Sequence, residues 1–224
     1  MDFSDWEPVY ERILADFGFE RAADEDARDR MSEYATPFDT ERLDCAGETV
    51  AVVGAAPSLA TELDRVRAAE RVFVASTAAD TLREADIAID CMVTDLDKNP
   101  GTARALTEEG TPVAAHAHGD NVPAVESVVP TFDAAHTLAT TQAAPIDAVY
   151  NFGGFTDGDR AAFLADAMGA EALVFPGWAF DDLSVPPMKA RKLRWAERLL
   201  HWLETRRGER FEVLDGRRDG LEIP

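Results

Sequence analysis

The chain has 224 residues and a formal net charge of −21, and 46% of its residues are hydrophobic. This apolar content is enough for a packed core and excludes global disorder. So acidic a chain repels nucleic acid and anionic membranes, and we expect neither as a partner. No apolar run approaches the roughly 20 residues of a membrane helix. The acidic N-terminus has no signal-peptide pattern, so we expect a cytoplasmic protein.

The first 32 residues have a helical pattern. Apolar side chains recur there at helical spacing, and the charged stretch 24–30 is expected to be exposed. We interpret residues 1–46 as an N-terminal helical segment that serves as a cap or as a contact in a homo-oligomer.

Strands and helices alternate from Thr49 onward. The expected strands are Thr49–Val53, Arg71–Ala75, Ile87–Val93, Pro112–Ala115, Ala148–Phe152 and Ala172–Phe175. The expected helices cover 59–69, Ala78–Glu84, Gly101–Glu109, Val122–Val128 and Asp157–Met168. This alternation predicts an α/β domain over residues 47–224, with a Rossmann-like, mostly parallel sheet and helices on both faces.

The C-terminal region predicts a long helix over Pro187–Arg207, because leucines and alanines form one apolar stripe and Gly208 follows as a stop signal. Phe211–Leu214 is a candidate edge strand. Cys45 and Cys91 are too few for a disulfide framework and lack zinc spacing, and Cys91 lies in an apolar run typical of a buried thiol.

Asp95 and Asp97 follow the third expected strand. In an extended backbone, side chains two residues apart point the same way, and paired carboxylates at a strand end suit Mg²⁺, which takes hard oxygen ligands. The alternative is an Asx-type turn before Asn99 and Pro100, where Asp is common because of local hydrogen bonds.

His116 and His118 alternate in the same way at the end of the fourth expected strand. With Asp120 they would fit a site of two histidines and one carboxylate for a transition metal. They would equally serve as hydrogen-bond donors to phosphate or as simple polar residues at a strand end. The more economical interpretation is that Asp120 joins Asp95 and Asp97 around Mg²⁺.

The turn Gly54–Leu59 follows the first strand and opens a helix. Free amide groups and the helix dipole favour an anion there, and Ser58 fits both an N-cap and a phosphate contact. The turn lacks the Walker A ending and the spacing of a dinucleotide-binding loop.

A glycine-rich turn, residues 153–160, precedes the last long helix of the sheet domain. Glycine allows a close approach of backbone to a ligand, Thr156 or Asp157 would cap the helix, and Arg160 would bind phosphate. The alternative is a surface ion pair of Arg160 with Asp157 or Asp159. Lys189 and Lys192, two of only three lysines, lie on one helix face and are candidates for neutralising phosphate; snorkelling surface lysines are the alternative.

Taken together, these segments resemble the archaeal 6-hydroxymethyl-7,8-dihydropterin pyrophosphokinase family. The resembling segments, in family order, are Gly54–Leu59 (GAAPSL), Val93–Asp97 (VTDLD), His116–Asn121 (HAHGDN), Thr140–Gln142 (TTQ), Asn151–Arg160 (NFGGFTDGDR) and Lys189–Leu193 (KARKL). The family usually has glycine where this chain has Ala56 and Lys98, and neither difference removes a carboxylate.

The resemblance implies that the chain transfers pyrophosphate from ATP to a reduced hydroxymethylpterin with Mg²⁺ and releases AMP. The catalytic residues it implies are Asp95, Asp97, Asp120, His116, His118 and Arg160, with the three aspartates on the metal and one histidine assisting deprotonation. The residues expected to contact ATP or pterin are Gly54, Pro57, Ser58, Asn121, Thr141, Gln142, Gly153, Gly154, Thr156, Asp157, Asp159, Lys189 and Lys192.

Three other functions fit the same sequence. They are another pyrophosphokinase, for example one acting on thiamine, a metal-dependent phosphohydrolase, and a non-catalytic nucleotide-binding module. Carboxylates gathered at three strand ends favour an enzyme, because carboxylates held close together are costly without a cation.

The acidic surface is expected to suit a salt-rich cytosol. The screening length falls from ~10 Å at about 0.1 M salt to ~3 Å at about 1 M, so repulsion among the surface charges weakens. We therefore predict a higher free energy of unfolding at the higher KCl concentration, measured by urea titration. Equal stability at both concentrations would contradict this; KCl is preferable to sulfate, which also strengthens hydrophobic burial.

Overall fold

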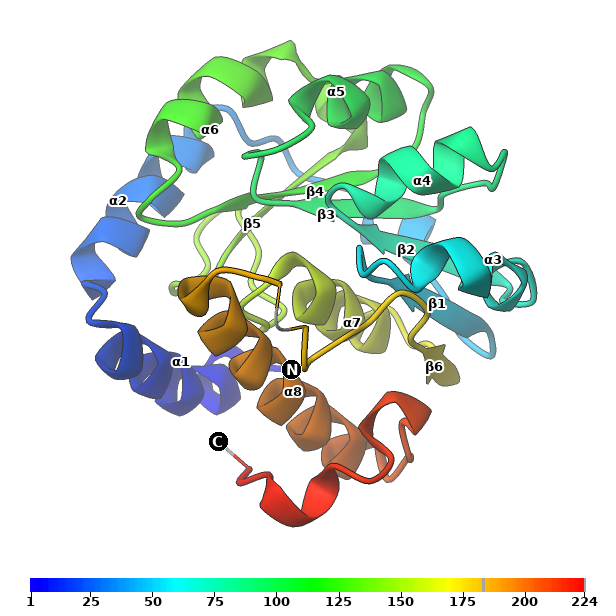
Figure 1. Cartoon of the computed structure of the whole chain (residues 1–224). Helices are drawn as coiled ribbons and strands as arrows, with labels where there is room; N and C mark the ends of the chain where they lie inside the picture. The colour runs from blue at the N-terminus through cyan, green and yellow to red at the C-terminus, as the bar shows by residue number, and fades with distance from the viewer. Residues whose placement is uncertain (183, 224) are drawn as a thin grey trace.

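The computed structural model describes residues 1–182 and 184–223, so residues 183 and 224 of the expected domain 47–224 lie outside it. Six strands form one parallel sheet in the order β5-β4-β3-β2-β1-β6. The strands are β1 (Thr49–Val53), β2 (Arg71–Ala75), β3 (Cys91–Thr94), β4 (Val113–Ala117), β5 (Thr137–Thr141) and β6 (Ala172–Val174). The predicted α/β class with a parallel sheet is confirmed (Figure 1).

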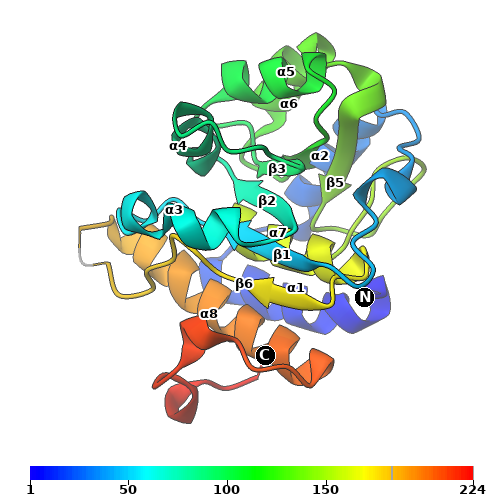
Figure 2. The same ribbon diagram turned by 90° about the vertical axis from the view of Figure 1, so that its right-hand side faces the viewer.

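Helices cover both faces of the sheet, as predicted (Figures 1 and 2). One face carries α3 (Leu59–Arg67), α4 (Ala78–Glu84), α5 (Pro100–Glu108) and α6 (Val122–Val128). The other carries α7 (Asp157–Ala167), with α1 (Phe3–Phe17) and α8 (Pro187–Arg207) packed around it. Helix α2 (Arg21–Ser32) lies against β4, β5 and α6.

The core follows the period of two expected of strands. Val50 and Val52 face the layer of α1, α7 and α8, whereas Ala51 and Val53 face the layer of α3 to α6. All four are fully buried. Because each strand is covered on both faces, its sequence is a nearly continuous apolar run instead of an alternating one.

The N-terminal segment packs into the same core as the sheet. Gly18 has a left-handed backbone (φ 71°) and separates α1 from α2, which divides the single helical stretch that the sequence suggested. Trp6 and Tyr10 are each 1% exposed, and the indole of Trp6 donates a hydrogen bond to the carbonyl of Gln142 at 3.0 Å. Helix α1 is therefore fixed to the segment that follows β5.

The fifth strand of the sheet is Thr137–Thr141, and the expected strand Ala148–Phe152 was wrong. In that segment Tyr150 makes only an isolated bridge to Thr140. The sequence TLATT was missed because threonine is polar, although its β-branched side chain suits strands. The whole of β5 is buried here.

Two further strand expectations differ from the structure. The third strand covers Cys91–Thr94 instead of Ile87–Val93, because Asp86 has a left-handed backbone (φ 53°) and the carboxylate of Asp90 accepts the amide of Val72. The expected edge strand Phe211–Leu214 contains a 3₁₀ turn over Glu212–Leu214.

The long C-terminal helix α8 has the predicted bounds. Its side chains Leu199, Leu200 and Leu203 are fully buried. Near its end, the Glu204 carboxylate accepts the amide of Phe211 at 2.8 Å, which draws the following chain onto the helix in place of a sheet edge. Among the described residues, no helix combines the length and apolar character required to cross a membrane.

The strand order places every strand's carboxyl end along one edge. Strands β1 to β5 are added successively in one direction, and β6 lies on the opposite side of β1. Ligands of open parallel sheets bind outside the carboxyl ends of the strands, next to such a change of direction. The fold thus points to this edge for the functional site.

Gly54, after β1, touches Gly177, after β6. A Cβ on Gly54 would lie 2.4 Å from the carbonyl oxygen of Gly177, and a Cβ on Gly177, which has φ 74°, would lie 2.3 Å from that of Gly54. The amide of Ala56 donates to Gly177 O at 2.9 Å. Two glycines are thus required for the loops after β1 and β6 to meet.

We predict that Gly54→Ala destabilises the protein by about 1–3 kcal/mol, because the added methyl group forces the two loops apart. Gly101→Ala is the matched control, since Gly101 lies in α5 with nothing within 4 Å of the added atom. In a helix this control change is expected to be neutral or to stabilise by up to ~1 kcal/mol. Urea titrations measure both; equal effects of the two substitutions would contradict the prediction.

Candidate active site

A cavity of about 780 Å³ opens at the carboxyl edge of the sheet. Its walls are the loops after β1 to β5, the first turn of α7, the junction of α1 and α2, residues of the segment 177–182, and residues from Val185 into α8. This volume lies within the range of small-molecule sites, roughly 300–1,000 Å³.

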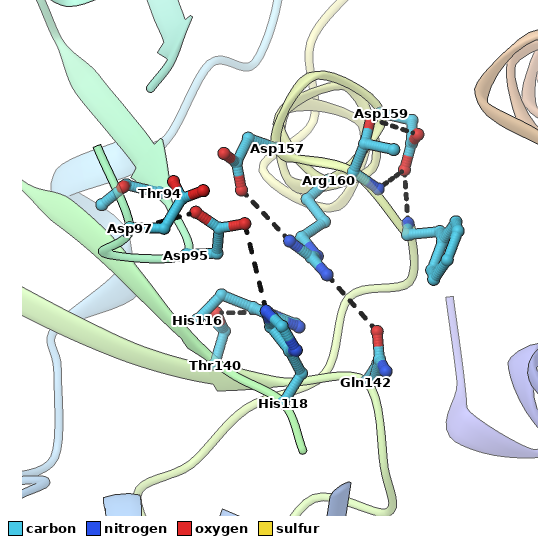
Figure 3. Close-up of polar contacts among 12 residues, drawn as sticks. Thr94, Asp95, Asp97, His116, His118, Thr140, Gln142, Asp157, Asp159 and Arg160 are labelled. Atoms are coloured by element: carbon cyan, nitrogen blue, oxygen red, sulfur yellow. Dashed lines mark hydrogen bonds and ion pairs between the residues drawn. The ribbon is translucent and has the colours of Figure 1, made fainter. Parts of the chain in front are cut away.

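Three carboxylates, those of Asp95, Asp97 and Asp157, lie near one another on one wall of the cavity (Figure 3). Asp95 and Asp97 are in a turn and not in extended backbone: Leu96 between them has φ 70°, and the amide of Asp97 donates to Asp95 Oδ1 at 3.4 Å. The Asx-type turn considered as an alternative is therefore present. It still leaves both carboxyls at the cavity wall, where the pKa of each depends on the other.

The three carboxyls resist being ionised together. Burial raises the pKa of Asp97, and its hydrogen bond to Asp95 raises it further. Burial acts the same way on Asp95, but the hydrogen bond from Asp97 and the charge of Arg160 outweigh it and lower that pKa to about 2. Burial and then the charge of Asp95 raise the pKa of Asp157 to about 7. A bound cation would relieve this repulsion.

Arg160 faces the carboxylates from α7. Its Nη1 lies 3.1 Å from Asp157 Oδ1, and its Nη2 donates to Gln142 Oε1 at 3.3 Å (Figure 3). Arg160 is 6% exposed and its Nε has no partner among the described residues. The pair with Asp157 is thus buried, unlike the surface pair considered from sequence.

Three lysines also line the cavity. Lys189 and Lys192 project from the first turns of α8, and Lys192 Nζ lies 5.7 Å from the ring centre of Phe155. Lys98 Nζ is 3.4 Å from Asp97 Oδ1. Burial lowers the pKa of Lys98, but the charges of Asp97 and Asp95 outweigh it and raise that pKa above its ordinary value.

The two histidines occupy different places. His118 lines the cavity with its Nε2 4.0 Å from Asp95 Oδ2, and burial followed by the charge of Arg160 lowers its pKa to about 4. His118 is therefore neutral at pH 7. His116 is 2% exposed, lies beneath the cavity beside Thr140 and does not line it; burial lowers its pKa strongly.

The residues after β4 divide between the cavity and the scaffold. Asp120 lines the cavity from an exposed turn three residues beyond β4. Asn121 is buried, where its amide donates to the carbonyls of Asp95 and His116 and its Oδ1 accepts the amide of His118. Asn121 thus joins two loops and does not line the cavity.

Asp95, Asp97 and Asp120 all line the cavity, but they do not form a ready-made metal site. Across residues 1–182 and 184–223, no three His, Cys, Asp or Glu side chains are grouped so that they could hold a metal ion. Asp120 is exposed in the turn after β4, whereas Asp95 and Asp97 are in the turn after β3.

Only part of the turn after β1 reaches the cavity. Gly54, Ala55 and Ala56 line it, whereas Pro57 and Ser58 do not. Ser58 stands at the N-cap position of α3 without a capping bond from its side chain, and its buried hydroxyl has no partner in the described structure. The expected phosphate contact by Ser58 thus lacks support from this geometry.

The glycine-rich turn is built for packing against α7. Gly153 and Gly154 both have φ 92°, and a Cβ on Gly154 would lie 2.6 Å from the Cα of Arg160. Asp159 is fully buried, and its carboxylate accepts the amides of Phe155 and Thr156 as a helix cap.

Only some of the residues expected to contact ATP or pterin from β5 and the glycine-rich turn line the cavity. Thr156 and Asp157 line it, and Gln142 faces it from the end of β5. Gly153, Gly154, Asp159 and the buried Thr141 do not.

Several cavity residues were missed from sequence. The charged stretch 24–30 was expected to be exposed, yet Asp24 is 4% exposed and lines the cavity with Phe19. Ser76, after β2, has a left-handed backbone (φ 45°), and its buried hydroxyl has no partner among the described residues. Ser76 could have been predicted, because it comes just after an expected strand, as Asp95 does. The spacing of residues along the chain gave no reason to select Asp24.

Comparison with known proteins identifies relatives that cover more than nine-tenths of the chain. Residues 29–183 match the family model described as 6-hydroxymethylpterin diphosphokinase MptE-like. A 6-hydroxymethyl-7,8-dihydropterin pyrophosphokinase of Methanothermobacter thermautotrophicus is 36% identical, over 95% of this chain and 99% of that protein. Proteins of the same name from Pyrococcus furiosus and Methanocaldococcus jannaschii are 37% and 28% identical, each over 91% of this chain and over 95% and 96% of their own lengths.

Proposed function

The chain belongs to the MptE-like family of 6-hydroxymethylpterin diphosphokinases, and on this premise we propose that it transfers a diphosphoryl group from ATP to the hydroxymethyl oxygen of 6-hydroxymethyl-7,8-dihydropterin. The oxygen attacks the β-phosphorus, the bond from that phosphorus to the α–β bridging oxygen breaks, and AMP leaves. The product enters the synthesis of tetrahydrofolate or of a methanopterin-type cofactor. Both substrates are small molecules, and the reaction is placed in the cytoplasm without nucleic acid or membrane.

The observation that carries this proposal is the meeting of opposite charges in one cavity. Carboxylates at the end of β3 and the start of α7 face Arg160 and Lys98, and Lys192 lines the same cavity. Phosphoryl transfer needs positioning and neutralisation of charge more than covalent chemistry by the protein. A cavity with both cations and carboxylates can hold a polyphosphate together with its metal ion.

Mg²⁺ fits the carboxylate wall. Asp95 and Asp97 offer hard oxygen donors, and burial followed by the charge of Asp95 raises the pKa of Asp157 beside them. Mg²⁺ usually takes only one or two protein carboxylates and completes its shell with water and phosphate. We propose that Asp95 and Asp97 hold the ion, with Asp120 available from the neighbouring loop. When bound, Mg²⁺ would neutralise phosphate charge.

The cations are proposed to act on the phosphates. Arg160 is held in place before substrate arrives, so its charge costs little reorganisation during the reaction, and such a donor contributes roughly 3–4 kcal/mol to transition-state stabilisation. Lys189 and Lys192 extend the positive wall from α8.

His118 is the better candidate for assisting proton removal. It is neutral at pH 7 and lines the cavity, whereas His116 lies beneath it. We propose that the hydroxymethyl proton passes to His118 or to water as the new P–O bond forms.

The direct test is one incubation with ATP, Mg²⁺ and the reduced hydroxymethylpterin. We predict AMP and a diphosphorylated pterin in equal amounts, measured by chromatography and ³¹P spectroscopy. ADP as the product would contradict diphosphoryl transfer, and orthophosphate without acceptor would indicate a hydrolase. Thiamine in place of the pterin is the control acceptor and is expected to give no product.

We further predict that Asp95→Asn and Asp120→Asn each lower turnover by more than about a hundredfold, the order expected when a preorganised charge is lost from a reaction centre. Asp64→Asn is the matched control, because that side chain is fully exposed on α3. Thermal unfolding verifies that each variant is folded. A near-normal rate in either Asp95→Asn or Asp120→Asn would contradict the role given to that residue.

A further inference from the structure

Asp24 is a buried carboxylate that the proposed reaction does not use. It lies in α2, is 4% exposed and borders the cavity. Its Oδ2 accepts the hydroxyl of Tyr10 at 2.7 Å and Nε2 of Gln142 at 2.8 Å, and its Oδ1 accepts the amide of Gly119 at 2.8 Å. Burying a carboxylate is costly unless such donors surround it.

These contacts determine which way the Gln142 side chain points. An amide group has donors on its nitrogen and acceptors on its oxygen. Because Asp24 accepts from Nε2, the oxygen Oε1 is turned toward Arg160, whose Nη2 donates to it at 3.3 Å. A flipped amide would set its oxygen against the carboxylate and its NH₂ against the guanidinium, so Asp24 excludes that orientation.

Arg160 is thereby held at two points. Asp157 binds Nη1, and the neutral Gln142 binds Nη2. The second contact fixes the guanidinium plane without neutralising its positive charge, because the Gln142 amide is uncharged. Gln142 is itself 4% exposed, and its carbonyl accepts the indole of Trp6, so its backbone has little freedom.

We propose that Asp24 is a positioning residue that orients Arg160 through Gln142, and that the N-terminal helices thereby take part in building the active site. This inference rests on the proposed function of Arg160 in charge stabilisation. A small displacement of such a group costs about 10- to 100-fold in rate. Asp24 thus acts on turnover without touching the reacting atoms.

The first experiment compares Asp24→Asn with Tyr10→Phe in the full chain. Asp24→Asn removes the charge and sets an NH₂ group against one side of the donor set that now surrounds the carboxylate, and it is expected to lower kcat at least tenfold while the KM for ATP changes less than threefold. Tyr10→Phe removes another donor from the same carboxylate oxygen but spares Gln142, and it is expected to stay within twofold of the wild-type kcat. Equal losses of kcat in the two variants would mean general loosening of the structure and would overturn the inference.

The second experiment tests the route by combining substitutions. Gln142→Met removes both side-chain contacts at similar volume and is expected to lower kcat as much as Asp24→Asn does. The double variant is expected to be no slower than either single one, and adding Asp24→Asn to Arg160→Lys is expected to change kcat less than twofold. Losses that multiply would show that Asp24 acts elsewhere, for instance through Gly119, and would overturn the route.

Folding and function are controlled separately. Thermal unfolding is recorded for every variant. If Asp24→Asn does not fold, Gln142→Met is the test: a loss of kcat of at least tenfold supports the inference, and a wild-type kcat overturns it. If the wild-type protein makes no diphosphorylated pterin, the proposed function fails. If the wild type is active and Asp24→Asn or Gln142→Met keeps its kcat, only the inference about Asp24 fails.

Discussion

The buried pair of Asp157 and Arg160 is the interaction on which the rest of the site depends. Both residues lie in the first turn of α7, and the carboxylate of Asp159 fixes the start of that helix by accepting the amides of Phe155 and Thr156. Gly154 permits this turn to lie against Arg160. Arg160 donates to Asp157 at 3.1 Å and to Gln142 at 3.3 Å, so the guanidinium is held at two points beside the cavity.

The sheet and its functional edge could be predicted from sequence because their signals are local. Apolar runs marked five of the six strands in whole or in part, and the segments after two of them contain Asp95 and His118, which line one cavity with Asp157. The missed strand Thr137–Thr141 is polar in composition, and its burial comes from neighbours far along the chain.

The division of roles within each motif could not be predicted. Asn121 and Asp159 have the chemistry of ligands, yet their hydrogen bonds are used up within the protein. Gly153 and Gly154 serve backbone packing. Asp24 could not be distinguished from the other charged residues of the stretch 24–30. It reaches Gln142 only because α2 packs against β4 and β5. Spacing reports which residues are near a strand end, and long-range packing decides which of them face the ligand.

The central claim is that a diphosphate and its metal ion lie between the β3 carboxylates and Arg160. The most direct measurement is a crystal structure with Mn²⁺ and an ATP analogue whose α–β bridge is a methylene group. The account predicts an anomalous Mn²⁺ peak at Asp95 and Asp97, with the β-phosphate facing Arg160. A nucleotide bound elsewhere, or a metal peak away from both aspartates, would contradict it.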